Sequence, residues 1–165
     1  MAEDVGSMHP SESALCETEV QVYKKIVVSY NESPEAQRAF VSAISLAKAL
    51  GAEVQTVTVM AELPSYTAFA GAADPSLPGV LREDRTRFYE TLAEKARKTG
   101  VDAGIEIHTH TAQGPPVDTI VRFVRECKAD LLIVGLHQRD LYIARLWGTV
   151  YELAQEAPCS VLGVH

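Results

Sequence analysis

Leu131-Leu132-Ile133-Val134-Gly135 is an unbroken apolar run that ends in glycine, and it decides the fold of this chain. A polar stretch follows, and then Gly148-Thr149 opens a helix-like segment. α/β proteins present backbone N–H groups to phosphates where a strand runs into a glycine-bounded loop and then a helix N-terminus. The chain closes with Ser160-Val161-Leu162-Gly163-Val164, which predicts a further strand. This stretch therefore predicts an α/β domain and the place of its ligand.

The elements expected upstream alternate between strand and helix. Ser33 and Pro34 predict a capped start of the first helix, and Gly51 predicts its end. Strands are expected over residues 25–30, 54–60, 105–111, 131–134 and 160–164, and helices over 34–50, 80–100, 149–156 and from 114–116 onward. Strict alternation predicts an α/β fold with an open parallel sheet of five strands, helices on both faces and right-handed crossovers. The strand at 105–111 has a wetter face and is expected at an edge of the sheet.

Composition excludes several classes of protein. With 165 residues, 47% hydrophobic and 22% charged, the chain fits one domain that buries about two thirds of its unfolded surface. A formal charge of −7 and a pI near 5.2 repel phosphate backbones, so no nucleic-acid partner is expected. No apolar span is long enough to cross a membrane, and the start lacks the features of a secretory signal. Cys16, Cys127 and Cys159 are odd in number and widely spaced, which indicates a reducing cytoplasm.

Two segments are expected to lie outside the regular core. Residues 1–20 are polar and aperiodic, which predicts a flexible N-terminal arm followed by a single domain over residues 21–165. Residues 63–79 are rich in proline and glycine, so a long loop is expected there, after the second strand and at the ligand end of the sheet.

The ligand of such a sheet binds beyond the carboxyl ends of the strands, where the strand order reverses. With the first and fourth strands as central neighbours, the crevice is expected between Tyr30-Asn31-Glu32 and residues 135–138, closed by Gly148-Thr149. A plainer interpretation stays open for these residues. The glycines equally suit turn and helix-start geometry, and Asn31 suits a turn ahead of the first helix.

These motifs together resemble the universal stress protein family over about Tyr23 to His165. The matching pieces are the first strand with Ser33 in the turn after it, Gly114-Pro115-Pro116, Ala129-Asp130 with the strand that ends at Gly135, Gly148-Thr149, and Ala157-Pro158-Cys159-Ser160-Val161-Leu162. The resemblance implies the strand order 3-2-1-4-5 of an adenine nucleotide alpha hydrolase-like fold, and a homodimer joined through the C-terminal strands.

In one branch of the family the resemblance also implies a bound adenine nucleotide, ATP or AMP, with Mg²⁺ if the ligand is ATP. The pattern there is glycine, two residues, glycine, nine residues, then glycine and serine or threonine. Gly135 and Gly148-Thr149 match it with the spacing intact. The binding residues implied in this sequence are Tyr30, Asn31, Val59, Gly114, Gly135, Gln138, Gly148, Thr149 and Val150.

Two departures from that pattern predict weak binding. Gln138 stands where the middle glycine belongs, and its side chain obstructs the approach of backbone to phosphate. Asn31 stands where such proteins often carry Asp near the nucleoside, although its amide still accepts and donates hydrogen bonds. The expected function is thus a stress-response regulator with a weak nucleotide crevice.

Two alternatives of function remain. The first is a dimeric interaction module of the same fold that binds no nucleotide, acting on a protein partner that the sequence does not identify. The second is a slow ATP hydrolase. It is less favoured because no catalytic triad, carboxylate pair or P-loop lysine is evident. His108 and His110 share one strand face without a third metal ligand, so they are expected to be solvent-facing edge residues.

Overall fold

The computed structural model describes residues 23–60, 77–136 and 148–165, so the expected arm at 1–20 and residues 63–76 of the loop expected at 63–79 lie outside the described residues. Residues 77–79 of that expected loop are helical. The five strands are β1 Lys25–Ser29, β2 Glu53–Met60, β3 Ile107–Gln113, β4 Leu131–Gly135 and β5 Ser160–Val164. The four helices in the described part are α1 Pro34–Leu50, α3 Leu77–Asp102, α4 Pro116–Glu126 and α5 Thr149–Glu156. All strands pair in parallel in the order β3-β2-β1-β4-β5, which confirms the predicted topology.

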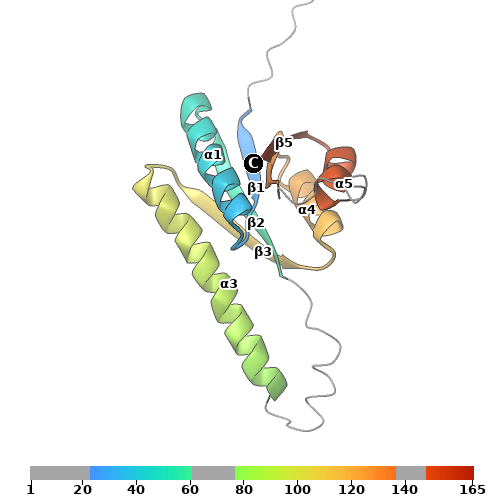
Figure 1. Cartoon of the computed structure of the whole chain (residues 1–165). Helices are drawn as coiled ribbons and strands as arrows, with labels where there is room; N and C mark the ends of the chain where they lie inside the picture. The colour runs from blue at the N-terminus through green and yellow to red at the C-terminus, as the bar shows by residue number, and fades with distance from the viewer. Residues whose placement is uncertain (1–22, 61–76, 137–147) are drawn as a thin grey trace, which may run out of the picture.

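The sheet separates two layers of helices, with α1 and α3 on one face and α4 and α5 on the other (Figure 1). β1 is buried on both faces because its side chains alternate between the two cores. Ile26 and Val28 pack with α1 and α3, whereas Val27 packs with α4 and α5. The continuous apolar run of the sequence is therefore explained by two cores, one on each side of the strand.

The first helix begins and ends as its capping residues predict. The Ser33 hydroxyl accepts a hydrogen bond from the backbone N–H of Ala36 at 3.2 Å, and Pro34 occupies the first helical position. Gly51 ends the helix with a left-handed φ of 67°, which a residue with a side chain adopts at a cost. The N-terminal cap fixes the start of α1 directly after the end of β1.

The bounds of the second described helix differ from the sequence expectation. α3 begins at Leu77, not at residue 80, because Pro78 lies in its first turn, where no helical N–H is required. It also continues past Gly100 to Asp102, and the left-handed residue is Gly104, with φ 75°. Gly100 instead lets the helix approach β3, since a Cβ there would lie 2.2 Å from Cγ1 of Ile107. The following strand accordingly begins at Ile107 and not at residue 105.

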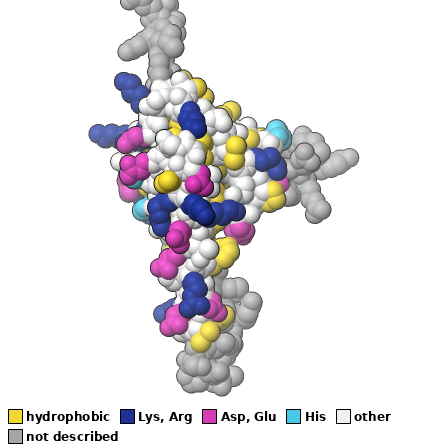
Figure 2. Space-filling view, turned by 90° about the vertical axis from the view of Figure 1, so that its left-hand side faces the viewer, with side chains coloured by type: hydrophobic (Ala, Val, Ile, Leu, Met, Phe, Trp, Pro, Cys, Tyr) yellow, Lys and Arg dark blue, Asp and Glu magenta, His cyan; other side chains and the backbone are white. Residues whose placement is uncertain are grey.

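α3 extends well beyond the sheet, whose outer strand β3 it covers only with its C-terminal half (Figure 1). Leu92 and Ala96 are its buried contacts, whereas Val80 and Phe88, nearer its N-terminus, are about half exposed. Figure 2 shows side chains of both charges along this helix. β3 lies at one edge of the sheet, as expected, and β5 lies at the other. None of the described helices is long and apolar enough to span a bilayer.

Candidate functional site

A crevice of about 330 Å³ lies beyond the carboxyl ends of β1 and β4. The chain leaves β1 toward β2 on one side and returns to place β4 on the other, so the strand order reverses at this point. Ligands of open α/β sheets bind at such reversals. The lining residues are Ser29, Tyr30, Asn31, Ser33, Ala36, Val59, Pro116, Ile120, Val134, Gly135, Thr149, Val150 and Leu153.

The structure brings six of the nine predicted site residues to this crevice: Tyr30, Asn31, Val59, Gly135, Thr149 and Val150. Gly148 directly precedes α5 as its N-cap residue. Gly114 does not line the crevice. It lies in the turn between β3 and α4 with φ 134°, and a Cβ there would lie 2.8 Å from Oγ1 of Thr119. Gln138 lies outside the described residues.

Several lining residues were not predicted as site residues from the sequence. Ser29, Pro116 and Ile120 were assigned only to a strand or a helix. Their signal was positional, since Ser29 ends β1 and Pro116 begins α4 after the Gly114-Pro115-Pro116 motif. Pro116 and Ile120 add apolar surface to the crevice, as is common in small-molecule sites.

Tyr30 lines the crevice, although the residue is buried at 2% exposure. Its ring lies 4.9 Å from the ring of Phe40, and its hydroxyl donates to Oε1 of Gln37 at 3.2 Å. Burial raises the pKa of the Tyr30 phenol, and the hydrogen bond to Gln37 opposes that shift. The phenol is thus used by the core and is not presented to a ligand.

Asn31 forms a local turn at the mouth of the crevice. Its Oδ1 accepts from the backbone N–H of Ser33 at 2.9 Å, and its carbonyl accepts from Nε2 of Gln37 at 2.9 Å. The turn role considered from the sequence is therefore present. Among the described residues, the NH₂ group of its exposed side chain makes no hydrogen bond, so it can donate to a ligand.

The two glycines of the predicted loop differ in what surrounds them. Gly135 is required by packing, because a Cβ there would meet the backbone of α1. Gly148 has no such constraint: its φ is −77°, and no described atom lies within 4 Å of where a Cβ would stand. Its missing side chain therefore leaves open space in front of the first turn of α5.

That first turn supplies the polar character of the site. The N-cap residue Gly148 has no side chain to cap α5, and the N–H of Tyr151 donates to the Gly148 carbonyl. Among the described residues, the N–H groups of Thr149 and Val150 make no hydrogen bond, so they are available to an acceptor together with the hydroxyl of the exposed Thr149. The helix dipole favours an anion at this position. The lining residues include no carboxylate or histidine, and Tyr30 is their sole ionisable group. The described lining therefore offers hydrogen-bond donors and contains no carboxylate or imidazole.

Other candidates from the sequence have structural roles. His110 stacks on Phe123 of α4 at 4.5 Å between ring centroids, and the described residues contain no group of three side chains suited to a metal. Burial raises the pKa of the Cys127 and Cys159 thiols, which disfavours the reactive thiolate.

Comparisons with known proteins agree with the observed fold. The model of the universal stress protein family matches residues 22–165. A universal stress protein of Methanocaldococcus jannaschii is 31% identical over 144 residues, which cover 87% of this chain and 82% of that protein. A universal stress protein solved in complex with cAMP has a TM-score of 0.63 and 26% identity, covering 87% of this chain and 98% of its own. A family protein of Arabidopsis thaliana with AMP bound shares the fold, with a TM-score of 0.62, 17% identity and 86% and 90% coverage.

Proposed function

The chain belongs to the universal stress protein family, and from that premise we propose that it is a stress-response regulator that binds an adenine nucleotide weakly in the crevice between β1 and β4. The observation that carries the proposal is the start of α5 at Gly148, where, among the described residues, no side chain caps the helix and no atom lies within 4 Å of where a Cβ would stand. A phosphate group suits that position because it accepts hydrogen bonds and its charge is favoured by the helix dipole. The cAMP complex of a related protein supports the choice of an adenine nucleotide.

The remaining walls suit the nucleoside. Val59, Ile120 and Val150 offer apolar contacts to a base, and Asn31 offers a polar contact at the mouth. No carboxylate lines the described crevice, so these residues do not form a magnesium site of their own. If the ligand is ATP, Mg²⁺ is expected to arrive on its phosphates.

Titration calorimetry with AMP and ATP tests the proposal. Gly148→Ser places a hydroxymethyl group in the open space and is expected to weaken binding of both nucleotides about fivefold or more, while serine remains a good N-cap residue. Gly79→Ala in α3 is the matched control, because it also adds a Cβ where no described atom lies within 4 Å. Wild-type protein that binds neither nucleotide at millimolar concentration would favour the alternative, a dimeric interaction module with no nucleotide.

Gln138→Gly addresses the departure from the family pattern. Restoring the middle glycine removes the side chain that we hold responsible for weak binding, and about fivefold tighter binding is expected. If wild-type protein binds at low micromolar concentration and the glycine variant binds no better, Gln138 is not the obstruction. Slow ATP hydrolysis remains the less favoured alternative, and a phosphate-release assay on the same proteins measures it.

Three further parts of the proposal concern the whole protein. Residues 21–165 are proposed as the folded domain and 1–20 as an arm, which the family match from residue 22 supports. A cytoplasmic location is proposed because Cys127 and Cys159 are both free thiols. A homodimer through β5 is proposed because this edge strand leaves Leu162 41% exposed.

A further inference from the structure

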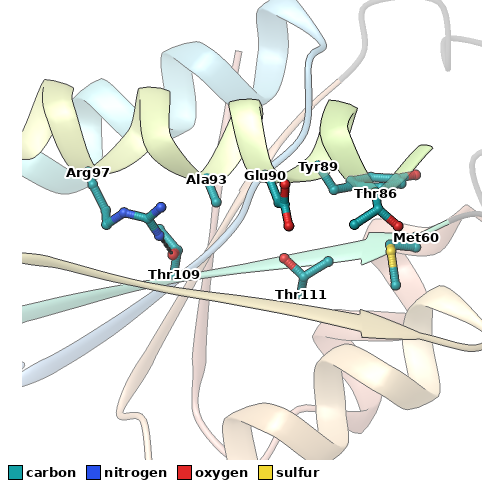
Figure 3. A pocket seen from close by; sticks show the side chains of 8 residues that line it. All are labelled: Met60, Thr86, Tyr89, Glu90, Ala93, Arg97, Thr109 and Thr111. Carbon is teal, nitrogen blue, oxygen red and sulfur yellow. Dashed lines mark hydrogen bonds between the residues drawn. The ribbon is translucent and has the colours of Figure 1, made fainter. Parts of the chain in front are cut away.

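A second hollow lies on the opposite side of the sheet from Val59 and α4, between α3 and the edge strand β3 (Figure 3). It measures about 370 Å³, and we refer to it as the α3 groove. Its lining residues are Met60, Thr86, Tyr89, Glu90, Ala93, Arg97, Thr109 and Thr111. Thr109 and Thr111 form its floor because alternate residues of β3 face α3, whereas His110 faces α4.

The α3 groove carries one charge of each sign. Glu90 and Arg97 are seven residues apart, so both side chains lie on the same face of α3 at an axial separation of about 10.5 Å. Arg97 donates from Nη1 to Oγ1 of Thr109, which holds its guanidinium over the floor. Within the described part of the chain, no lysine or arginine forms an ion pair with Glu90. Figure 3 shows the Glu90 carboxylate directed toward Thr111.

We propose that the α3 groove binds a short peptide with free ends, its terminal ammonium at Glu90 and its terminal carboxylate at Arg97. An extended chain of three residues spans about 10 Å, which matches the separation of the two charges. The planar guanidinium presents parallel N–H donors that fit a carboxylate. The threonine hydroxyls along the groove can donate to and accept from the backbone of a peptide.

The last side chain of the peptide also has a place. Arg97 lines an adjoining apolar hollow together with Val101, Ile105 and Ile107. A terminal carboxylate at Arg97 therefore leaves the neighbouring side chain beside apolar surface, which favours leucine or a similar residue. Glu106 also lines that hollow, and its charge disfavours an acidic last side chain. A single amino acid is too short to reach both charges, and a simple anion is repelled by Glu90.

The tripeptide Ala-Ala-Leu is the probe. It is titrated into the full chain, and binding is followed by the backbone NMR signals of the protein. We expect a millimolar dissociation constant and shifts in the signals of Glu90, Arg97 and Thr111. N-acetylation and C-amidation of the probe are each expected to weaken binding about two- to fivefold, the size of effect that exposed ion pairs have. Glu90→Gln is expected to abolish the difference between free and acetylated probe. Arg97→Gln is expected to abolish the difference between free and amidated probe.

The controls are Glu94→Gln and Arg87→Gln, which remove the same charges from exposed positions of α3 that do not line the groove. Both are expected to keep the wild-type discrimination between free and capped probes. Capped and free probes that bind wild-type protein equally, or the absence of any shift at about 10 mM probe, would overturn the inference. Adding AMP at saturation is expected to leave the probe affinity unchanged, because the two sites share no lining residue; competition would overturn the assignment to the α3 groove.

Discussion

A Cβ on Gly135 would stand 2.4 Å from the carbonyl carbon of Glu35, so the end of β4 and the first turn of α1 meet backbone to backbone. The carbonyl oxygen of Glu35 and the nitrogen of Ala36 would lie 2.6 and 2.7 Å away. The contact fixes α1 against the strand whose end forms the crevice. Gly135 is thus needed by the fold, whereas nothing in the described part of the chain requires a glycine at position 148.

Gly135→Ala is expected to lower the free energy of unfolding by about 1–3 kcal/mol, because rigid backbone atoms must move to admit the methyl group. Urea denaturation followed by circular dichroism measures the change. Gly79→Ala adds the same methyl group to a helical glycine with open space around it and is expected to stabilise by about 0.5–1 kcal/mol. Equal stability of the two variants would contradict the close contact.

The sheet and its order could be predicted because each strand is a local signal and the alternation of elements restricts the topology. The ends of α3 could not, because they depend on tertiary contacts. Gly100 is typical of a helix end in the sequence. In the structure a glycine is needed there because a Cβ would collide with the side chain of Ile107 in the next strand. Pro78 reads as a loop residue, yet it occupies the first turn of α3.

The candidate site was predictable in part for a similar reason. Residues at or just beyond the ends of β1 and β4 must lie at the carboxyl edge of the sheet, so Asn31 and Gly135 could be assigned to it from topology alone. The direction of a side chain could not be read from the sequence. The ring of Tyr30 packs against the ring of Phe40 in α1, and its hydroxyl donates to Gln37.

Asn31→Asp is expected to tighten adenosine and AMP binding alike, by about two- to fivefold. The carboxylate keeps an oxygen to accept from the Ser33 N–H and provides a second oxygen for ribose hydroxyls. Calorimetry with both ligands measures the gain, and urea denaturation is expected to show unchanged stability. A gain for AMP that is absent for adenosine would contradict the assignment of Asn31 to the nucleoside.

Leu162→Lys is expected to dissociate the proposed homodimer. A lysine on an edge strand opposes pairing with a second strand, and Leu162 is 41% exposed, so the chain itself is expected to stay folded. Light scattering at micromolar concentration should give about twice the chain mass of 17.9 kDa for wild-type protein and a single chain mass for the variant. Val41→Lys, at a 58% exposed position of α1, is the control and should remain dimeric. A monomeric wild-type protein would refute the dimer.

The buried phenol of Tyr30 and the half-buried thiols of Cys127 and Cys159 predict loss of stability at alkaline pH. Burial raises the pKa of each group in the folded chain, from 10.0 for the phenol and 9.0 for the thiols. A raised pKa means that the folded state holds its proton more tightly, so this contribution to stability is complete below the unfolded pKa and is lost as pH rises through the folded value. The free energy of unfolding should therefore decline above about pH 9, and more steeply above about pH 10.

Tyr30→Phe separates the phenol from the thiols. The variant is expected to lose about 0.5–1.5 kcal/mol at neutral pH, because the hydroxyl no longer donates to Gln37. Above about pH 10 its stability should decline less steeply than that of wild-type protein, since it has no phenol to ionise on unfolding. Urea midpoints measured in reducing buffer from pH 7 to about pH 11 test this, with Tyr151→Phe as the control at a 43% exposed tyrosine. If wild-type and Tyr30→Phe curves stay parallel throughout, burial of the phenol does not contribute to alkaline unfolding.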